Sequence, residues 1–175
     1  MNETIFKAMQ EADLPSVLEL YNHYIVTTTA TFHPAPISME TLRELISLEH
    51  PWYKAFVICH AGEMAGFCFL TAFKKIEPYN RTVEVGVYVK PEFTRRGLGT
   101  RAVRYLEKVA AETGRKVVIA SISGENAASI ELFRSLQYEE CAHFNRVGEK
   151  WGRAIDVVFF QRSLEDDAAA AGDAP

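Results

Sequence analysis

Residues 83–103 read VEVGVYVKPEFTRRGLGTRAV, and this stretch decides the fold. Its first seven residues alternate valine with other residues, a period of two that predicts a β-strand. Its last residues begin an apolar-periodic helix, which we expect to run from about Leu98 to Glu112 and to end near Gly114. The connection contains RRGLGT, which is rich in glycine and arginine. A strand, a glycine-rich loop and a helix in this order predict an anion-binding helix N-terminus.

The chain on both sides of this stretch alternates strand-like and helix-like patterns, and no linker interrupts it. Upstream we expect a strand at residues 4–9, a helix capped by Asp13, a loop at 27–38, a second helix capped by Ser38, and a hairpin with strands at 54–59 and 64–73. Downstream we expect a strand at 117–122, a helix at 126–136, and strands at 139–147 and 154–161. This order predicts one α/β (α+β) domain over residues 1–163, followed at 164–175 by an acidic, Ala-rich tail whose composition predicts disorder.

The composition of the 175-residue chain is that of a water-soluble domain, with 48% hydrophobic and 24% charged residues. The chain has 19 basic and 23 acidic residues, which is unlike the basic balance of a general nucleic-acid binder. Its apolar runs, such as residues 65–73, are far shorter than the ~20 residues of a membrane span. The acidic N-terminal residues do not resemble a signal peptide. We therefore expect a cytoplasmic protein without nucleic-acid or membrane partners.

The cysteine and histidine patterns do not favour a metal site. The three cysteines, Cys59, Cys68 and Cys141, include no C-x-x-C pair, and the five histidines lie far apart in the sequence. Cys59 and Cys68 lie within apolar runs and are expected to pack as small hydrophobic residues. We expect no metal cofactor.

The glycine-rich loop fits neither common nucleotide fingerprint. A P-loop ends in Gly-Lys-Ser/Thr, whereas this loop ends in Gly99-Thr100-Arg101. The dinucleotide pattern G-x-G-x-x-G requires a third glycine at position 102, where this chain has Ala102. The loop nevertheless has the parts of a pyrophosphate site. Its glycines let a ligand approach the backbone, its helix N-terminus presents amides, and Arg95 and Arg96 add charged donors. The alternative is an ordinary turn with solvated arginines.

The order of elements, together with residues 87–103, resembles the Gcn5-related N-acetyltransferase superfamily. Four segments are similar to the phosphinothricin and methionine sulfoximine acetyltransferases in particular: ADLPSVLELYNHYIVTTTATF (12–32), TVEVGVYV (82–89), ENAASIELF (125–133) and VGEKWGRAIDVVFFQ (147–161). The resemblance covers residues 4–163. It implies a mixed, mostly antiparallel sheet of about seven strands flanked by about four helices.

The resemblance implies that acetyl-CoA is the acetyl donor. The superfamily's loop is Q/R-x-x-G-x-G/A, and here its leading position is Thr94, which departs from the pattern. The pantetheine arm would lie beside the central strand like an added strand, and the asparagine at the start of the next helix would both cap that helix and contact the arm. The implied cofactor-binding residues are Val87, Tyr88, Val89, Arg95, Arg96, Gly97, Leu98, Gly99, Thr100, Asn126 and Ser129.

Glu84 is the candidate general base. Acetyl transfer to an amine requires that the ammonium lose a proton, and Glu84 is the only acid within the valine-rich strand. The sequence alone equally allows a solvent-facing carboxylate on a half-exposed strand. The match of residues 82–84 to the TVE of the related acetyltransferases favours catalysis, either directly or through water.

The resemblance also indicates where the amine substrate would bind. The candidate residues are Phe32, Phe73, Lys74, Tyr79 and Arg81. The related enzymes place a basic residue at Lys74, near the anionic end of the substrate, and herbicide-type enzymes carry an arginine where this chain has Ile76. This difference favours methionine sulfoximine and related amino acids over phosphinothricin.

Three alternatives of function remain open at this point. Related enzymes commonly carry His or Tyr at position 133, where this chain has Phe133, which cannot protonate a leaving thiolate. The leading prediction is an N-acetyltransferase of the α-amine of a small amino-acid-like substrate. A non-catalytic acyl-CoA-binding module and a protein or peptide N-acetyltransferase are the alternatives.

Because the VVFFQ segment (157–161) indicates a strand buried on both faces and relatives are commonly dimers, we also expect a homodimer.

Overall fold

The computed structural model describes residues 3–165. Within them, seven strands form one sheet in the order β1-β2-β3-β4-β5-β7-β6. The strands are β1 (Thr4–Ala8), β2 (Ala55–His60), β3 (Glu63–Ala72), β4 (Thr82–Val89), β5 (Val117–Ser123), β6 (Glu139–Lys150) and β7 (Arg153–Ser163). The helices are α1 (Leu14–Thr27), α2 (Met39–Leu45), α3 (Leu98–Glu112) and α4 (Ala127–Ser135). The predicted order of elements and the mostly antiparallel sheet are confirmed, since only β4 and β5 pair in parallel.

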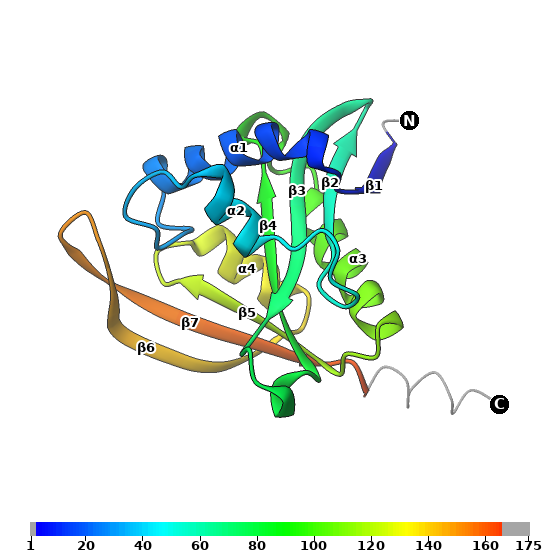
Figure 1. Cartoon of the computed structure of the whole chain (residues 1–175). Coiled ribbons are helices and arrows are strands. Elements are labelled where there is room, and N and C mark those ends of the chain that lie inside the picture. Colours follow the sequence, from blue (N-terminus) through cyan, green and yellow to red (C-terminus); the bar gives the residue numbers. More distant parts are fainter. Residues whose placement is uncertain (1–2, 166–175) are drawn as a thin grey trace.

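The helices cover both faces of the sheet and create two hydrophobic cores (Figure 1). The valines of β4 at positions 83, 85, 87 and 89 pack in the core beneath α3 and α4. The opposite face of the sheet carries Phe67, Phe69 and Tyr88, which pack against α1 and α2. The period-two pattern of β4 therefore serves both faces, with the valines on one face and Thr82, Glu84, Gly86 and Tyr88 on the other.

The sheet is split between β4 and β5. Their parallel pairing covers only three positions, and the last pair is Glu84 with Ile119. Beyond that point β4 stays paired with β3 as far as Val89, whereas β5 stays paired with β7 as far as Ser123. The two strands thus separate toward their carboxyl ends, and a gap opens in the middle of the sheet.

Capping was predicted correctly for one of the first two helices. Ser38 Oγ accepts the amide of Thr41 at 3.2 Å, as expected for the N-cap of α2. Asp13 precedes α1, but its carboxylate does not cap that helix. It accepts the amide of Gln10 at 2.8 Å instead, because the chain first makes a short 3-10 turn at Glu11–Asp13. Asp13 therefore occupies the predicted N-cap position of α1 but makes no side-chain capping bond there.

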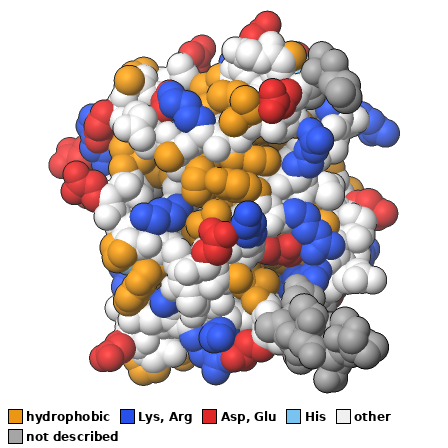
Figure 2. Space-filling model, turned by 90° about the vertical axis from the view of Figure 1, so that its right-hand side faces the viewer, with side chains coloured by type: hydrophobic (Ala, Val, Ile, Leu, Met, Phe, Trp, Pro, Cys, Tyr) orange, Lys and Arg blue, Asp and Glu red, His pale blue; other side chains and the backbone are white. Residues whose placement is uncertain are grey.

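The surface carries charges of both signs. The face in Figure 2 shows hydrophobic side chains gathered near its centre, with Lys or Arg and Asp or Glu side chains interspersed around them. Phe6 of β1 stacks on Tyr105 of α3, with ring centroids 4.4 Å apart, so α3 is attached to the edge strand of the sheet.

The predicted tail is described only at its start. The amide of Leu164 donates to the oxygen of Lys116 at 2.8 Å, and Glu165 pairs with Arg81 at 2.7 Å. These two residues therefore remain attached to the domain. The rest of the segment predicted to be disordered lies outside the described residues.

Candidate active site

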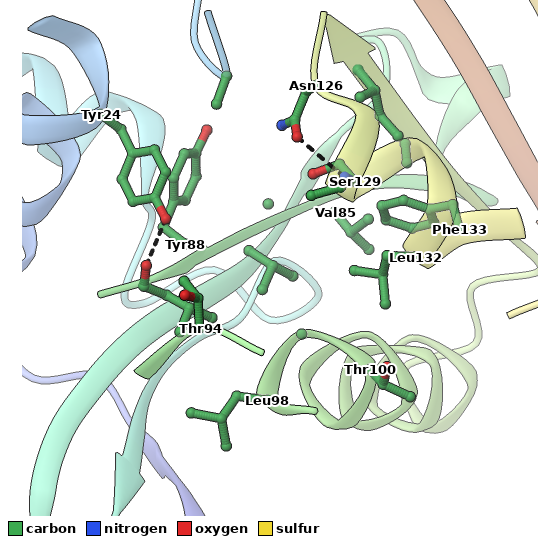
Figure 3. A pocket seen from close by; sticks show the side chains of 18 of the residues that line it. Tyr24, Val85, Tyr88, Thr94, Leu98, Thr100, Asn126, Ser129, Leu132 and Phe133 are labelled. Atoms are coloured by element: carbon green, nitrogen blue, oxygen red, sulfur yellow. Dashed lines mark hydrogen bonds between the residues drawn. The ribbon is translucent and has the colours of Figure 1, made fainter. Parts of the chain in front are cut away.

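A cavity of about 410 Å³ occupies the gap between β4 and β5. It is lined by residues 85–89 of β4, by residues 120–123 of β5, by the connection between β4 and α3, and by the first turns of α3 and α4. Figure 3 shows the α4 side chains on one side of this space and the loop and α3 side chains on the other. The cavity exists because the two strands separate, so its shape follows directly from the sheet topology.

The glycine-rich loop forms one end of this cavity. Arg95 and Gly97 both have left-handed backbone conformations, with φ of 59° and 74°, and a Cβ added at Gly97 would meet nothing within 4 Å. The first helical bond of α3 runs from the Arg101 amide to the Gly97 oxygen, so the amides of Leu98, Gly99 and Thr100 are free of intrahelical partners. No acidic side chain lies in the first turn of α3. The loop therefore presents amides and open space to an anion.

Two residues of β4 direct their main-chain groups toward the gap. The Lys90 amide donates to Ala65 of β3 at 2.8 Å, and alternate residues of an antiparallel strand direct their main-chain groups to opposite sides. Val87 and Val89 consequently direct theirs toward the gap, while Tyr88 directs its own toward β3. The Val89 oxygen already accepts the hydroxyl of Tyr24 at 2.5 Å. Of the three positions predicted to bind through main-chain groups, Val87 and Val89 thus face the gap, and the amide of Val89 is the group left to it there.

The start of α4 forms the wall opposite α3. Asn126 caps α4 by accepting the Ser129 amide at 3.1 Å, which confirms the capping prediction, and both residues line the cavity. Leu132 approaches the glycine loop closely, since a Cβ at Gly99 would lie 3.2 Å from its Cδ2 atom. Phe133 is buried against Tyr138, with ring centroids 4.9 Å apart. It offers the cavity an apolar surface with no proton donor.

Glu84 lies where the gap begins. It forms the last parallel pair with β5, and the next residue, Val85, lines the cavity, although Glu84 itself does not. Its side chain is on the face of the sheet that carries Tyr88, two pleats along the strand. Within residues 3–165 its carboxylate has no hydrogen-bond or ion-pair partner, and burial raises its pKa to about 7. A carboxyl group with this pKa can accept a proton near neutral pH.

Three of the predicted substrate residues lie together on the loop between β3 and β4. The ammonium of Lys74 lies 4.7 Å from the ring centroid of Tyr79 and 5.7 Å from that of Phe73. Cation–π contacts of this kind hold a lysine in place at a surface. The cluster is at the end of the sheet where Glu84 lies, since Ala72 pairs with Val83 and Thr71 with Glu84.

The other predicted residues lie apart from this cluster. Phe32 packs over Gly148 of β6, where an added Cβ would be 2.6 Å from its ring. Arg81 is paired with Glu165 at a separate hollow that also contains Trp52 and Arg115. Arg96 donates to the main-chain oxygen of Glu92 and lies over the Phe93 ring, outside the cavity lining. These three remain predictions without support from the geometry of the cavity.

Sequence reasoning did not identify several residues that line the cavity. Tyr24 carries no signal of a binding role, because it lies on the same face of α1 as Tyr21 and has the spacing of an ordinary core residue. Residues 120–122 of β5 were predicted to be part of a buried strand, and nothing in their pattern indicates that β4 turns away from them. Thr94 also lines the cavity, with its hydroxyl donating to the oxygen of Pro91 at 2.8 Å.

The described part of the chain contains no group of three or more His, Cys, Asp or Glu side chains that could hold a metal ion. No helix in residues 3–165 is both long and apolar enough to span a membrane.

Comparison with known proteins agrees with this geometry. Residues 17–138 match the profile of the acetyltransferase (GNAT) family. The L-methionine sulfoximine/L-methionine sulfone acetyltransferase of Pseudomonas aeruginosa is 32% identical over 161 residues, covering 91% of this chain and 94% of that protein.

Two solved structures are also similar. The phosphinothricin acetyltransferase of Sinorhizobium meliloti, in complex with acetyl-CoA, has a TM-score of 0.86 at 28% identity, covering 92% of this chain and 88% of that one. The ribosomal-protein-alanine N-acetyltransferase of Brucella melitensis has a TM-score of 0.85 at 31% identity, covering 91% and 99%. With its split sheet, glycine-rich loop and matching profile, the chain belongs to the acetyltransferase (GNAT) family.

Proposed function

We propose that this protein transfers the acetyl group of acetyl-CoA to the α-amine of a small amino-acid-like acceptor of the methionine sulfoximine or phosphinothricin type, with Glu84 as general base. The observation that carries the proposal is the cavity between β4 and β5, which has an anion-binding loop at one end, together with the carboxyl group of raised pKa at Glu84, next to the cavity-lining Val85. The similarity to acetyltransferases of amino-acid analogues supports the acceptor class.

The residues around the glycine loop fit a pyrophosphate group. The open space at Gly97 is a cradle that a side chain would fill, and the free amides of residues 98–100 lie beside it. Arg95 lines the same end of the cavity and can add a charge-assisted bond. The gap-facing main-chain groups of Val87 and Val89 suit an arm that binds as an added strand.

The chemistry requires two proton movements. Bound acetyl-CoA supplies the acetyl thioester, and the reaction forms the new amide bond while the carbon–sulfur bond breaks. Glu84 holds the proton that leaves the acceptor's ammonium, directly or through a water molecule. The main-chain amide of Val87 lies on the gap side of β4 and can donate to the carbonyl oxygen as charge develops there. Both groups belong to one strand, which fixes their relative positions.

The proton that the sulfur receives cannot come from position 133. Phe133 is the cavity residue at that place on α4, and its ring has no exchangeable proton. Hydroxyl groups of Ser129 and Ser123 line the same cavity, and solvent reaches it from the open side. A thiolate is a good leaving group, so we propose that water or one of these hydroxyls supplies the proton.

A second acceptor class is favoured by one observation. The similar structure from Brucella melitensis is described as a ribosomal-protein-alanine N-acetyltransferase, whose acceptor is a protein. Against this class, Lys74, Phe73 and Tyr79 gather into a basic and aromatic cluster at one end of the sheet, which suits a small acceptor with its own carboxylate.

The test is an assay of free thiol release from acetyl-CoA. The acceptors are methionine sulfoximine, methionine sulfone, phosphinothricin, the common amino acids and a peptide beginning with alanine. We expect methionine sulfoximine or methionine sulfone to give the highest kcat/KM. Turnover of the peptide alone would replace the proposed acceptor class. Tight acetyl-CoA binding without turnover of any acceptor would favour a non-catalytic acyl-CoA-binding module.

We further propose that the protein is a cytoplasmic homodimer. All three cysteines are free thiols, as is usual in a reducing compartment. Most side chains of the VVFFQ segment are buried within the chain itself, so that segment no longer argues for a partner. Support comes instead from the β6–β7 hairpin, which exposes the large apolar side chains of Phe144, Val147 and Trp151. Light scattering at micromolar concentration tests this, and a monomer would contradict it.

A further inference from the structure

Lys150, at the end of β6, is a buried cation outside the machinery described above. Its side chain belongs to a residue that is only 3% exposed, and its ammonium donates to the main-chain oxygens of Thr28 and Thr31 at 2.8 and 2.7 Å. No carboxylate within residues 3–165 forms an ion pair with it. Burying a cation without a carboxylate is costly, and the two carbonyl bonds offset that cost together with the Trp151 ring, whose centroid lies 5.0 Å from the ammonium.

The two acceptors belong to the segment that leaves α1, residues 28–32. Thr28 is the C-cap of α1, where the exposed carbonyls make a favourable site for a cation. The same segment is held from a second side, because the Thr29 hydroxyl lies 3.1 Å from that of Ser123 at the end of β5. Thr29 and Ser123 are both buried. Residues 28–32 are therefore fixed to the carboxyl end of β5 and to the end of β6.

This segment forms part of the cavity wall. Ala30 lines the cavity together with Tyr24 of α1 and Ser123 of β5. Phe32, two residues further, packs against Gly148, which shares a face of β6 with Lys150. One stretch of β6 thus holds both ends of residues 28–32, one by a charge-assisted bond and the other by a close contact with the Phe32 ring. In Figure 1 the β6–β7 hairpin extends toward the connection that follows α1.

We propose that Lys150 is a positioning residue for the amine acceptor, holding residues 28–32 so that Ala30 keeps its place in the cavity wall and Phe32 stays packed on Gly148. This inference rests on the proposed N-acetyltransferase function. Within the described residues, neither Lys150 nor residues 28–32 are bonded to the glycine loop or to the first turn of α3, so the pyrophosphate contacts of acetyl-CoA should be kept. The ammonium acts through the loop and takes no part in the transfer.

The first variant is Lys150→Met, which keeps the length and apolar character of the side chain but removes the charge and its three donors. We expect the acceptor KM to rise about tenfold and the acetyl-CoA KM to stay within about twofold of the wild type. Lys150→Arg keeps a charged donor and should recover part of the acceptor affinity. Lys108→Met is the matched control, because Lys108 is exposed on α3 and forms only a surface pair with Glu112.

Hydrogen exchange gives a readout that needs no substrate. Amides of residues 28–32 should exchange faster in Lys150→Met, whereas those of α3 should be unchanged. If Lys150→Met is poorly folded, Thr29→Val loosens the same segment from the β5 side and should raise the acceptor KM in the same direction.

The outcomes separate this inference from the proposed function. Unchanged exchange at residues 28–32, an equal rise in both KM values, or a lower melting temperature with an unchanged acceptor KM would overturn the positioning role. If the wild type acetylated only the peptide, the proposed acceptor class would fail, while the exchange data and the peptide KM would still decide the role of Lys150.

Discussion

The hydroxyl of Tyr24 donates a 2.5 Å hydrogen bond to the main-chain oxygen of Val89, which joins α1 to the end of β4 at the cavity. Figure 3 shows this bond beside the Tyr88 ring, which Tyr24 contacts edge to face with centroids 5.3 Å apart. Burial raises the pKa of Tyr24, so the hydroxyl keeps its proton. The bond fixes one of the two main-chain carbonyls that face the gap.

We therefore expect Tyr24→Phe to weaken acetyl-CoA binding. Loss of one hydrogen bond of about 1 kcal/mol corresponds to an increase of about fivefold in the acetyl-CoA KM. The matched control is Tyr21→Phe, which removes a hydroxyl one turn earlier on α1 that bonds to the Tyr88 side chain and not to a main-chain group of β4. Equal KM values for Tyr24→Phe and Tyr21→Phe would contradict a role for the Tyr24 bond.

Gly97→Val tests the anion-binding loop. The substitution places a branched side chain in the open space beside the amides of residues 98–100, at a φ of 74° that such residues rarely adopt. We expect the acetyl-CoA KM to rise more than about tenfold, because the phosphate site is filled.

Gly114→Val supplies the control for backbone strain. Gly114 follows the same helix, has a φ of 78°, and would also place its Cβ in open space, but it lies outside the cavity. Both variants should lose similar stability in thermal unfolding, and only Gly97→Val should lose acetyl-CoA affinity. A similar KM in the two variants would remove the loop from the binding site.

The order of the elements could be predicted from the sequence because each element has its own local sequence pattern. Alternation of valines identified β4, and Ser38 and Asn126 identified two helix starts by their capping chemistry. Asp13 takes the predicted N-cap position without the capping bond, because its carboxylate could cap either α1 or the turn before it, and only the backbone path decides between these.

The cavity could not be predicted from the residues alone. A strand has the same side-chain pattern whether its neighbour stays paired or turns away, so the separation of β4 from β5 after Glu84 leaves no local signal. Lys150 likewise has the sequence pattern of an ordinary surface lysine near a turn. Its burial depends on residues 28–32, which lie more than a hundred positions away.

Lys74 is expected to recognise the carboxylate of the acceptor. Lys74→Met should raise the KM of an amino-acid acceptor about fivefold, as for the loss of an exposed charge pair of about 1 kcal/mol. Lys75→Met is the matched control and should have little effect, because only Lys74 contacts the Phe73 and Tyr79 rings. With an acceptor whose carboxylate is replaced by an amide, Lys74→Met and the wild type should have the same acceptor KM. A KM loss that persists with that amide would contradict the assignment.

Glu84→Gln tests the general base. The change removes proton acceptance and nearly preserves size, so kcat should fall by about 100- to 10,000-fold. Acetyl-CoA binding should change little, since the glycine loop and the gap-facing groups of Val87 and Val89 are untouched. The wild-type kcat/KM should rise with pH through the pKa of Glu84, about 7, and the variant should lose this rise. Near-normal kcat in a folded variant would remove Glu84 from the chemistry.

The same substitution should also change how the stability of the fold depends on pH. Burial raises the pKa of Glu84 from 4.5 to about 7, so the folded protein holds this proton more tightly than the unfolded chain does. The resulting stabilisation is complete below pH 4.5 and is lost as the pH rises through about 7, a loss on the order of 3 kcal/mol. Glu84→Gln has no proton to lose. Between pH 4.5 and about 7, the free energy of unfolding of the wild type should therefore fall relative to that of Glu84→Gln. Above about pH 7, the difference between the two proteins should stay constant. Chemical denaturation at pH 4.5, 6 and 8 measures the difference, and a constant difference across these values would show that the carboxyl group is not held in a desolvated site.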